Sequence, residues 1–199
     1  MLKKLSIAAA TALGIVLAGG TAQAQTFDVS GTNSWDSLGD SDNEVLTLDI
    51  ADALGIGSGS AVNLFGVDWD LTIETADTTG AALGFSSWLS EADIQITDTV
   101  GNILFDLGPS NDSVPGTGTF TGSESLATPA FLADGLVNVE FYESFDDAPG
   151  AIDATFLPVS TLTFNAESAE PIDVPEPAFL LGFALLGGEL YRRKRKNKG

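Results

Sequence analysis

The sequence contains no cysteine and no histidine. Without cysteine the protein has no disulfide framework, no thiolate zinc site and no thiol nucleophile. Without histidine it lacks the most common general base and the most common transition-metal ligand, which excludes a Ser-His-Asp or Cys-His mechanism. Enzymatic chemistry would therefore have to come from carboxylates, as in glycoside hydrolysis.

Basic residues are scarce and confined to the two ends of the chain. The 199 residues include 8 lysines and arginines against 28 acidic residues, and no basic residue lies between Lys4 and Arg192. Segment 25–174 holds every acidic residue except Glu176 and Glu189. Such a segment repels nucleic acid and anionic membrane surfaces, so nucleic acid is excluded as a partner. With 44% hydrophobic residues, the chain still has enough apolar surface to fold.

The N-terminal segment 1–24 has the three parts of a secretory signal. Two lysines precede an apolar run over 5–18, and small residues follow as far as Ala24. The alternative, an amphipathic first helix, fails because the run has no polar face. The order predicts an exported protein that signal peptidase cleaves after Ala24, leaving Gln25 as the first residue.

A second apolar stretch, 178–190, lies near the C-terminus and is followed by six basic residues within 192–198. Cations beside an apolar segment mark its cytoplasmic side, which predicts a short transmembrane helix with the middle of the chain outside. A helix over 178–190 would rise about 20 Å, against roughly 30 Å of hydrocarbon. The alternative is a buried globular helix with a solvated basic tail.

The residues ahead of this stretch make the C-terminus specific. Pro175, Glu176 and Pro177, then the apolar stretch, then a basic end that begins with Arg192 and Arg193, resemble the PEP-CTERM sorting signal. The resemblance implies recognition and cleavage by exosortase, a membrane-embedded protease of Gram-negative bacteria. It also implies an intermediate anchored in the inner membrane, a host that makes exopolysaccharide, and a product at the cell surface or in the extracellular matrix.

The middle of the chain alternates between apolar and polar residues with period two. The clearest segments are 45–50, 71–74, 92–97, 137–142 and 161–164. Turn-forming clusters at 55–60, 108–112 and 146–150 separate them, and no helical period is sustained. We therefore predict an all-β fold, a single β-sandwich or jelly roll over 25–170, followed by a linker and the sorting tail over 171–199.

Two stretches of the middle domain carry a further resemblance. Segment 66–96 looks like the N-terminal half of jelly-roll domains found in other PEP-CTERM proteins. Segment 134–147 is similar to the closing hairpin of sandwiches that resemble the convertase P-domain. Both likenesses imply a fold and no activity.

The clustered acids Glu140, Glu143, Asp146 and Asp147 raise the question of a carboxylate-based glycoside hydrolase. In so acidic a segment such clusters arise by chance, and Glu140 alternates with apolar neighbours as an outward strand position. A solvated surface explains them better. We predict a domain that is not an enzyme.

Carboxylates at alternate positions also suit calcium, which prefers oxygen ligands. Asp40, Asp42 and Glu44 have this spacing, although Val45 and Ala51 stand where an EF-hand needs glycine and glutamate. A second candidate loop contains Asp146, Asp147 and Asp153. The alternative is that both are simply turns rich in Asp and Asn.

Three tryptophans are candidates for sugar binding. Trp69 follows Val67 by two residues and is expected on the buried face, whereas Trp35 lies in a polar stretch and is expected to be exposed. The sequence thus predicts an exported, non-enzymatic surface or matrix protein with a structural or adhesive role linked to exopolysaccharide. A carbohydrate-binding module is the alternative, and a glycoside hydrolase the third hypothesis.

Overall fold

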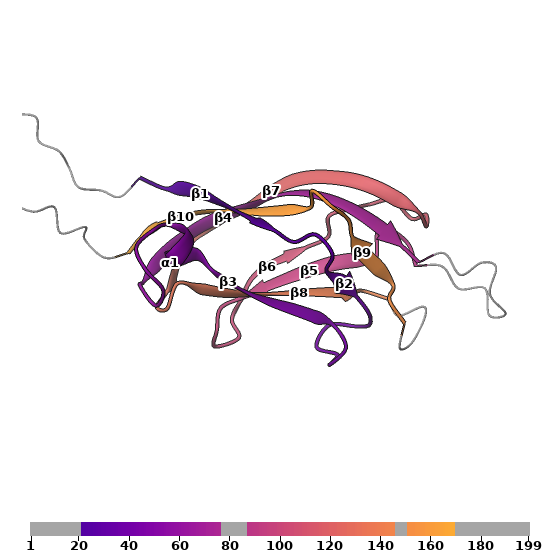
Figure 1. The fold of residues 1–199 in the computed structure, drawn as a ribbon, viewed down its shortest axis with the longest axis horizontal. Coiled ribbons are helices and arrows are strands. Elements are labelled where there is room, and N and C mark those ends of the chain that lie inside the picture. Colours follow the sequence, from indigo (N-terminus) through magenta and orange to yellow (C-terminus); the bar gives the residue numbers. More distant parts are fainter. Residues whose placement is uncertain (1–20, 77–86, 146–150, 170–199) are drawn as a thin grey trace, which may run out of the picture. The chain divides into compact units, whose positions relative to one another are not determined.

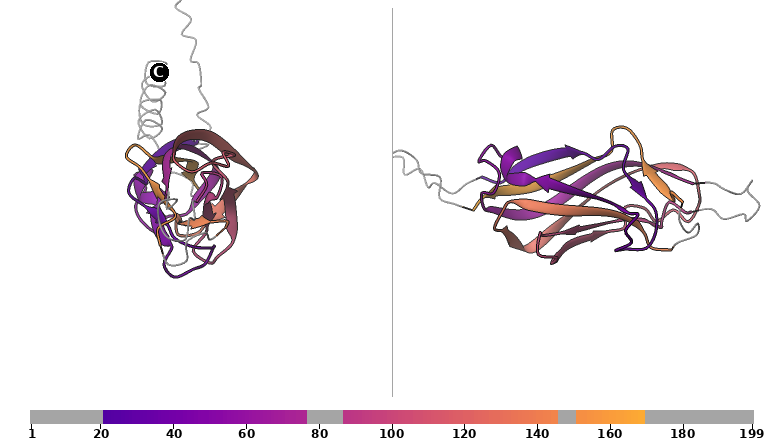
Figure 2. Two further views of the ribbon diagram at one scale, coloured as in Figure 1. Left: turned by 90° about the vertical axis from the view of Figure 1, so that its right-hand side faces the viewer. Right: turned by 60° about the horizontal axis from the view of Figure 1, so that its bottom comes forward.

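The structure is a computed structural model that describes residues 21–76, 87–145 and 151–169. These residues belong to one compact unit, Gly20–Glu170, built from two antiparallel sheets that lie face to face (Figure 1; Figure 2). Residues 1–20 of the predicted signal segment, the Pro-Glu-Pro motif and the apolar and basic parts of the tail lie outside the described residues. Within the described ranges, no helix has the length and apolar character needed to cross a membrane.

The larger sheet has six strands and the smaller one has four. In spatial order, the larger sheet contains β1 (Gln23–Asp28), β10 (Thr161–Ser168), β4 (Val62–Thr75), β9 (Ala154–Phe156) and β2 (Asn33–Ser34), with β7 (Thr117–Leu132) paired to β4. The smaller sheet contains β3 (Glu44–Asp49), β8 (Leu136–Glu143), β5 (Ala92–Thr97) and β6 (Ile103–Leu107). A single turn of helix, α1 (Ile50–Ala53), follows β3.

The prediction of an all-β fold is confirmed, and each alternating segment lies wholly or mainly in a strand. In β8 and β10 the alternation places every second side chain in the core, because successive side chains of a strand point to opposite faces. The sequence did not reveal β7, whose run TGTFTGSESLATPAFL is rich in small and hydroxylated residues. That strand is fixed by its long antiparallel pairing with β4 rather than by burial of its own side chains.

The core fills the space between the two sheets. Its largest fully buried side chains include Phe105, Phe141, Phe156 and Phe164. The rings of Phe141 in β8 and Phe156 in β9 meet edge to face with centroids 4.8 Å apart, so this pair joins the two sheets directly. Trp69 packs against the same core, as expected from its position two residues after Val67.

Strand β1 begins two residues before the predicted mature N-terminus. Its first pairs join Gln23 to Ala166 and Ala24 to Asn165 in β10. Cleavage after Ala24 would remove those two pairs and keep the four from Gln25 to Asp28. The processed chain would therefore still hold β1 as the edge strand of the larger sheet.

Candidate functional site

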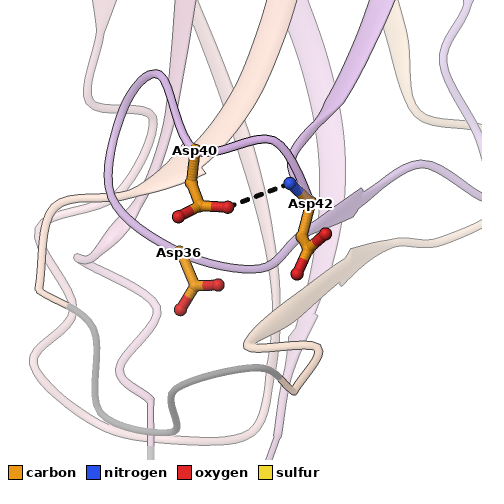
Figure 3. A group of neighbouring side chains, drawn as sticks. All are labelled: Asp36, Asp40 and Asp42. Carbon is orange, nitrogen blue, oxygen red and sulfur yellow. Dashed lines mark hydrogen bonds between the residues drawn. The ribbon is translucent and has the colours of Figure 1, made fainter.

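The loop between β2 and β3 gathers three carboxylates. Oxygen atoms of Asp36, Asp40 and Asp42 all lie within 4.8 Å of one another, and their side chains extend from the same loop toward a shared space (Figure 3). The backbone N–H of Asp42 donates to Oδ1 of Asp40 at 3.0 Å. Asp36 is buried, whereas Asp40 and Asp42 are exposed. We call these three residues the acidic loop.

Asn43 holds the acidic loop in shape. Its Oδ1 accepts hydrogen bonds from the backbone N–H of Trp35 at 3.2 Å and of Asp36 at 3.0 Å. Its Nδ2 donates to Oε1 of Glu140 in β8 at 3.0 Å, and the same oxygen accepts from the backbone N–H of Gly39 at 2.6 Å. The loop is therefore fastened to the smaller sheet by one buried amide and one carboxylate.

The structure brings together two of the three residues that the sequence suggested as calcium ligands in this loop. Asp40 and Asp42 come together, but Glu44 does not join them. Its Oε1 accepts a hydrogen bond from Nδ2 of Asn33 at 2.7 Å. The third carboxylate comes from Asp36, which lies outside the alternating run, and only the folding of the loop brings it close.

A second group of acids, a buried pair, lies between the sheets. Glu143 ends β8 and Asp153 immediately precedes β9, and both side chains are fully buried. The hydroxyl of Ser87 donates to Oδ1 of Asp153 at 3.0 Å. Backbone bonds tie this pair to the β2 region, because Glu143 N–H donates to the carbonyl of Asp36 at 3.0 Å and Asp153 N–H donates to that of Ser34 at 2.9 Å.

Burial is the main influence on the protonation of this pair. It raises the pKa of Glu143 far above its usual range, and the neighbouring carboxyl of Asp153 and the charge of Glu91 raise that pKa further. The Ser87 hydroxyl lowers the pKa of Glu143 by less than these effects raise it. The buried environment therefore favours the protonated form of Glu143 at neutral pH.

The outer face of the smaller sheet carries further acids. Burial, together with the charges of Asp106 and Glu91, raises the pKa of Asp93 to about 6, although a hydrogen bond from Ser144 opposes this shift. The hydroxyl of Tyr142, which faces Asp93 across the strand pair, donates to Oδ1 of Asp106 at 2.9 Å. Burial and this bond raise the pKa of Tyr142.

The acids that suggested a glycoside hydrolase do not form an accessible pair where the structure describes them. Glu140 and Glu143 are three residues apart on β8, so they point to opposite faces of the sheet. Glu140 fastens the acidic loop, and Glu143 is sealed in the core. The other two candidates, Asp146 and Asp147, lie outside the described residues.

The tryptophans differ from the expectation in one respect. Trp88 is exposed over 44% of its surface, whereas Trp35 is only partly exposed, so the expectation that Trp35 would be the exposed one was wrong. Trp35 directly follows β2, and its backbone is held by Asn43. Trp88 lies in a turn closed by its own N–H donating to Oε2 of Glu91 at 2.7 Å.

Comparison with known proteins adds no assignment. No family model matches this chain, and no curated protein is significantly similar to it. The two carboxylate clusters are the acidic loop and the buried pair of Glu143 and Asp153. Both offer only oxygen ligands, which suit hard cations such as calcium rather than zinc or copper.

Proposed function

We propose that this protein is an exported, non-enzymatic structural or adhesive component of the cell surface or extracellular matrix, sorted through its C-terminal tail. The observation that carries the proposal is the order of the tail, Pro175-Glu176-Pro177, apolar 178–190 and basic 192–198, behind a domain without any basic residue. A leader ending at Ala24 completes the export route. Signal peptidase and exosortase are its processing enzymes, and the inner membrane holds it only in transit.

The strand order supports the finer fold assignment, a jelly roll. Without the short strands β2 and β9, the order β1-β10-β4-β7 faces the order β3-β8-β5-β6. Successive strands cross between the two sheets except at the β5–β6 pair, as two interlocked Greek keys require. This fold serves many binding and structural proteins, so it agrees with the role without specifying it.

A matrix role fits the electrostatics of the domain. The 28 acidic residues of the chain lie almost entirely in a segment that has no lysine or arginine, so copies of the domain and acidic polysaccharides repel each other in low salt. Divalent cations remove this repulsion. At the acidic loop, Asp36, Asp40 and Asp42 supply three of the roughly six to eight oxygens that calcium takes, which leaves positions for water or for polysaccharide oxygens.

Intact-mass analysis of the protein from its own host, with envelope and culture medium measured separately, tests the sorting proposal. The expected product begins at Gln25, ends near Pro175 to Pro177 and is found in the medium or matrix. The Arg192→Ala, Arg193→Ala double variant should accumulate in the envelope as a species that still ends at Gly199. A wild-type protein confined to the envelope and ending at Gly199 would contradict processing and remove the main support for a matrix role.

One observation favours a carbohydrate-binding module as the second candidate. Trp88 and Phe145 are exposed over 44% and 63% of their surfaces. Their loops are joined by the N–H of Ser144, which donates to the carbonyl of Glu91 at 2.9 Å. Two exposed aromatic rings on adjoining loops suit the apolar faces of sugar rings.

Affinity electrophoresis in gels that contain the exopolysaccharide of the host tests this second candidate. Trp88→Ala is expected to weaken retardation about tenfold, because an exposed aromatic anchor carries much of such binding. Trp35→Ala is the matched control and should migrate like the wild type. Equal migration of wild type and Trp88→Ala, with or without polysaccharide, would reject the module.

A further inference from the structure

The buried end of the sandwich brings oxygen ligands together from both sheets. The inner face of β8 carries every second side chain, namely Val139, Phe141 and Glu143. The ring of Phe141 contacts that of Phe156 in the facing sheet. Ser34 in β2 pairs with Ala154, two residues before Phe156, and is fully buried as well. Side chains two residues apart share a face, so Ser34 and Glu143 enter the same layer between the sheets from opposite sides.

Polar atoms in this layer lack the partners that buried groups normally have. Among the described residues, three buried oxygens have no hydrogen-bond partner at good geometry: the hydroxyl of Ser34 and both carboxylate oxygens of Glu143. Both side chains are 0% exposed. Buried polar groups in native proteins are almost always hydrogen-bonded, and buried charges are paired or bound to metal. Several buried polar groups without partners in one layer therefore indicate a ligand site.

Buried carboxylates are often paired with a lysine or arginine side chain, but the sequence provides none in this domain. No lysine or arginine occurs between Lys4 and Arg192, so none can pair with the carboxylates of Glu143 and Asp153 from within this domain. A proton shared between the two acids would satisfy one oxygen of Glu143. It would leave the other oxygen and the Ser34 hydroxyl as they are.

We propose that a divalent cation of the calcium class binds between the two sheets, held by the carboxylates of Glu143 and Asp153 with the hydroxyls of Ser34 and Ser87 beside them. Two carboxylates match the charge of the ion, and a set made only of oxygen ligands selects a hard cation. The site is separate from the acidic loop, and a matrix role does not require it. Its consequence is structural, because one ion would join β2, β8 and β9 at the end of the sandwich.

Thermal melting and equilibrium dialysis with radioactive calcium test the proposal on the full chain in detergent micelles after dialysis against EDTA. Calcium at about 100 times Kd is expected to raise the Tm by about 5 to 10 °C beyond sodium chloride of equal ionic strength. Glu143→Gln and Asp153→Asn should each lose this increase. Glu124→Gln, the matched control at an exposed acid of β7 outside both carboxylate groups, should keep it.

Three results would overturn the proposal: no calcium-specific increase in the wild type, an increase that survives in Glu143→Gln, or an increase that disappears in Glu124→Gln. The first would leave Glu143 and Asp153 as a pair that shares only a proton. The second would place the calcium response outside the buried pair, for instance at the acidic loop, and the third would show that the response depends on net charge. Because the readout is the melting of purified protein, failure here is distinct from failure of sorting, which intact mass reports.

Discussion

In calcium-free buffer at pH 7.5, Glu143→Gln is expected to stabilise the domain. Glutamine has nearly the shape of glutamate but never ionises, so the buried layer no longer holds a group whose charge is unfavourable there. Because a raised pKa costs about 1.4 kcal/mol per unit between the unfolded value and the working pH, the substitution is expected to stabilise by at most about 4 kcal/mol, with an increase in Tm of roughly 2 to 4 °C per kcal/mol for a domain of this size. Thermal melting in EDTA measures the effect directly.

The stability of the domain is expected to fall as the pH rises, because the pKa of Glu143 is raised in the folded state. The carboxyl of Glu143 ionises near 4.5 in the unfolded chain but far above that in the folded one, so stability falls as pH rises above 4.5. Asp93 acts in the same direction between 3.8 and about 6. We therefore expect a higher Tm at pH 5 than at pH 8. Asp28, Asp98 and Asp134, whose pKa values are lowered, contribute stability that is lost only below about pH 4.

Glu143→Gln separates this effect from general charge repulsion. The groups that act on Glu143 are Asp153, Glu91 and the hydroxyl of Ser87, and the buried Ser34 pairs with Ala154 in the other sheet. The variant removes one carboxyl and leaves all the others, so only the contribution of Glu143 to the slope of Tm against pH should disappear. An unchanged slope, or a lower Tm at pH 7.5 in EDTA, would show that Glu143 is not an unfavourable buried acid.

Gly135→Ala is expected to destabilise the domain by about 3 kcal/mol. Gly135 lies in the turn between β7 and β8 with φ of +68°, and a Cβ there would come within 2.5 Å of the Cβ of Ala51 and 2.6 Å of the carbonyl oxygen of Ser60. Its own carbonyl accepts from the N–H of Ile50 at 2.9 Å. The turn cannot move away without breaking this contact with α1. Urea unfolding measures the loss.

Gly57→Ala is the matched control for Gly135→Ala. Its φ is +89°, so alanine is strained there too, but no atom lies within 4 Å of the added Cβ. It should cost only about 1 to 2 kcal/mol. Equal losses in the two variants would mean that the close approach of the β7–β8 turn to α1 contributes nothing to stability.

Some parts of the fold could be predicted from the sequence because they depend on side chains alone. Strands β5 and β8 alternate between apolar and polar residues, and burial of one face fixes such segments in any sandwich. Strand β7 has no such signal. Gly122 has no side chain to bury and instead lies under the ring of Trp69, a contact that exists only because β4 pairs with β7.

The candidate sites also contain some residues that could be predicted from the sequence and others that only the fold brings together. Asp40 and Asp42 are neighbours in sequence, so their meeting could be predicted from spacing. Asp36 joins them because Asn43 and Glu140, which come from different parts of the chain, fasten the loop. The burial of Glu143 could not be predicted from the sequence, in which Glu143 is one of several acids in segment 140–147.

By itself, the sequence determined the chemistry that this protein lacks, the all-β character of its middle segment and the unopposed negative charge of that segment. Those properties are sums over residues or local patterns, so they do not depend on how the strands are arranged. Only the tertiary structure decided which acids are solvated and which are buried. Glu140 and Glu143 are three residues apart, yet the pleat of β8 directs one toward the acidic loop and the other between two sheets.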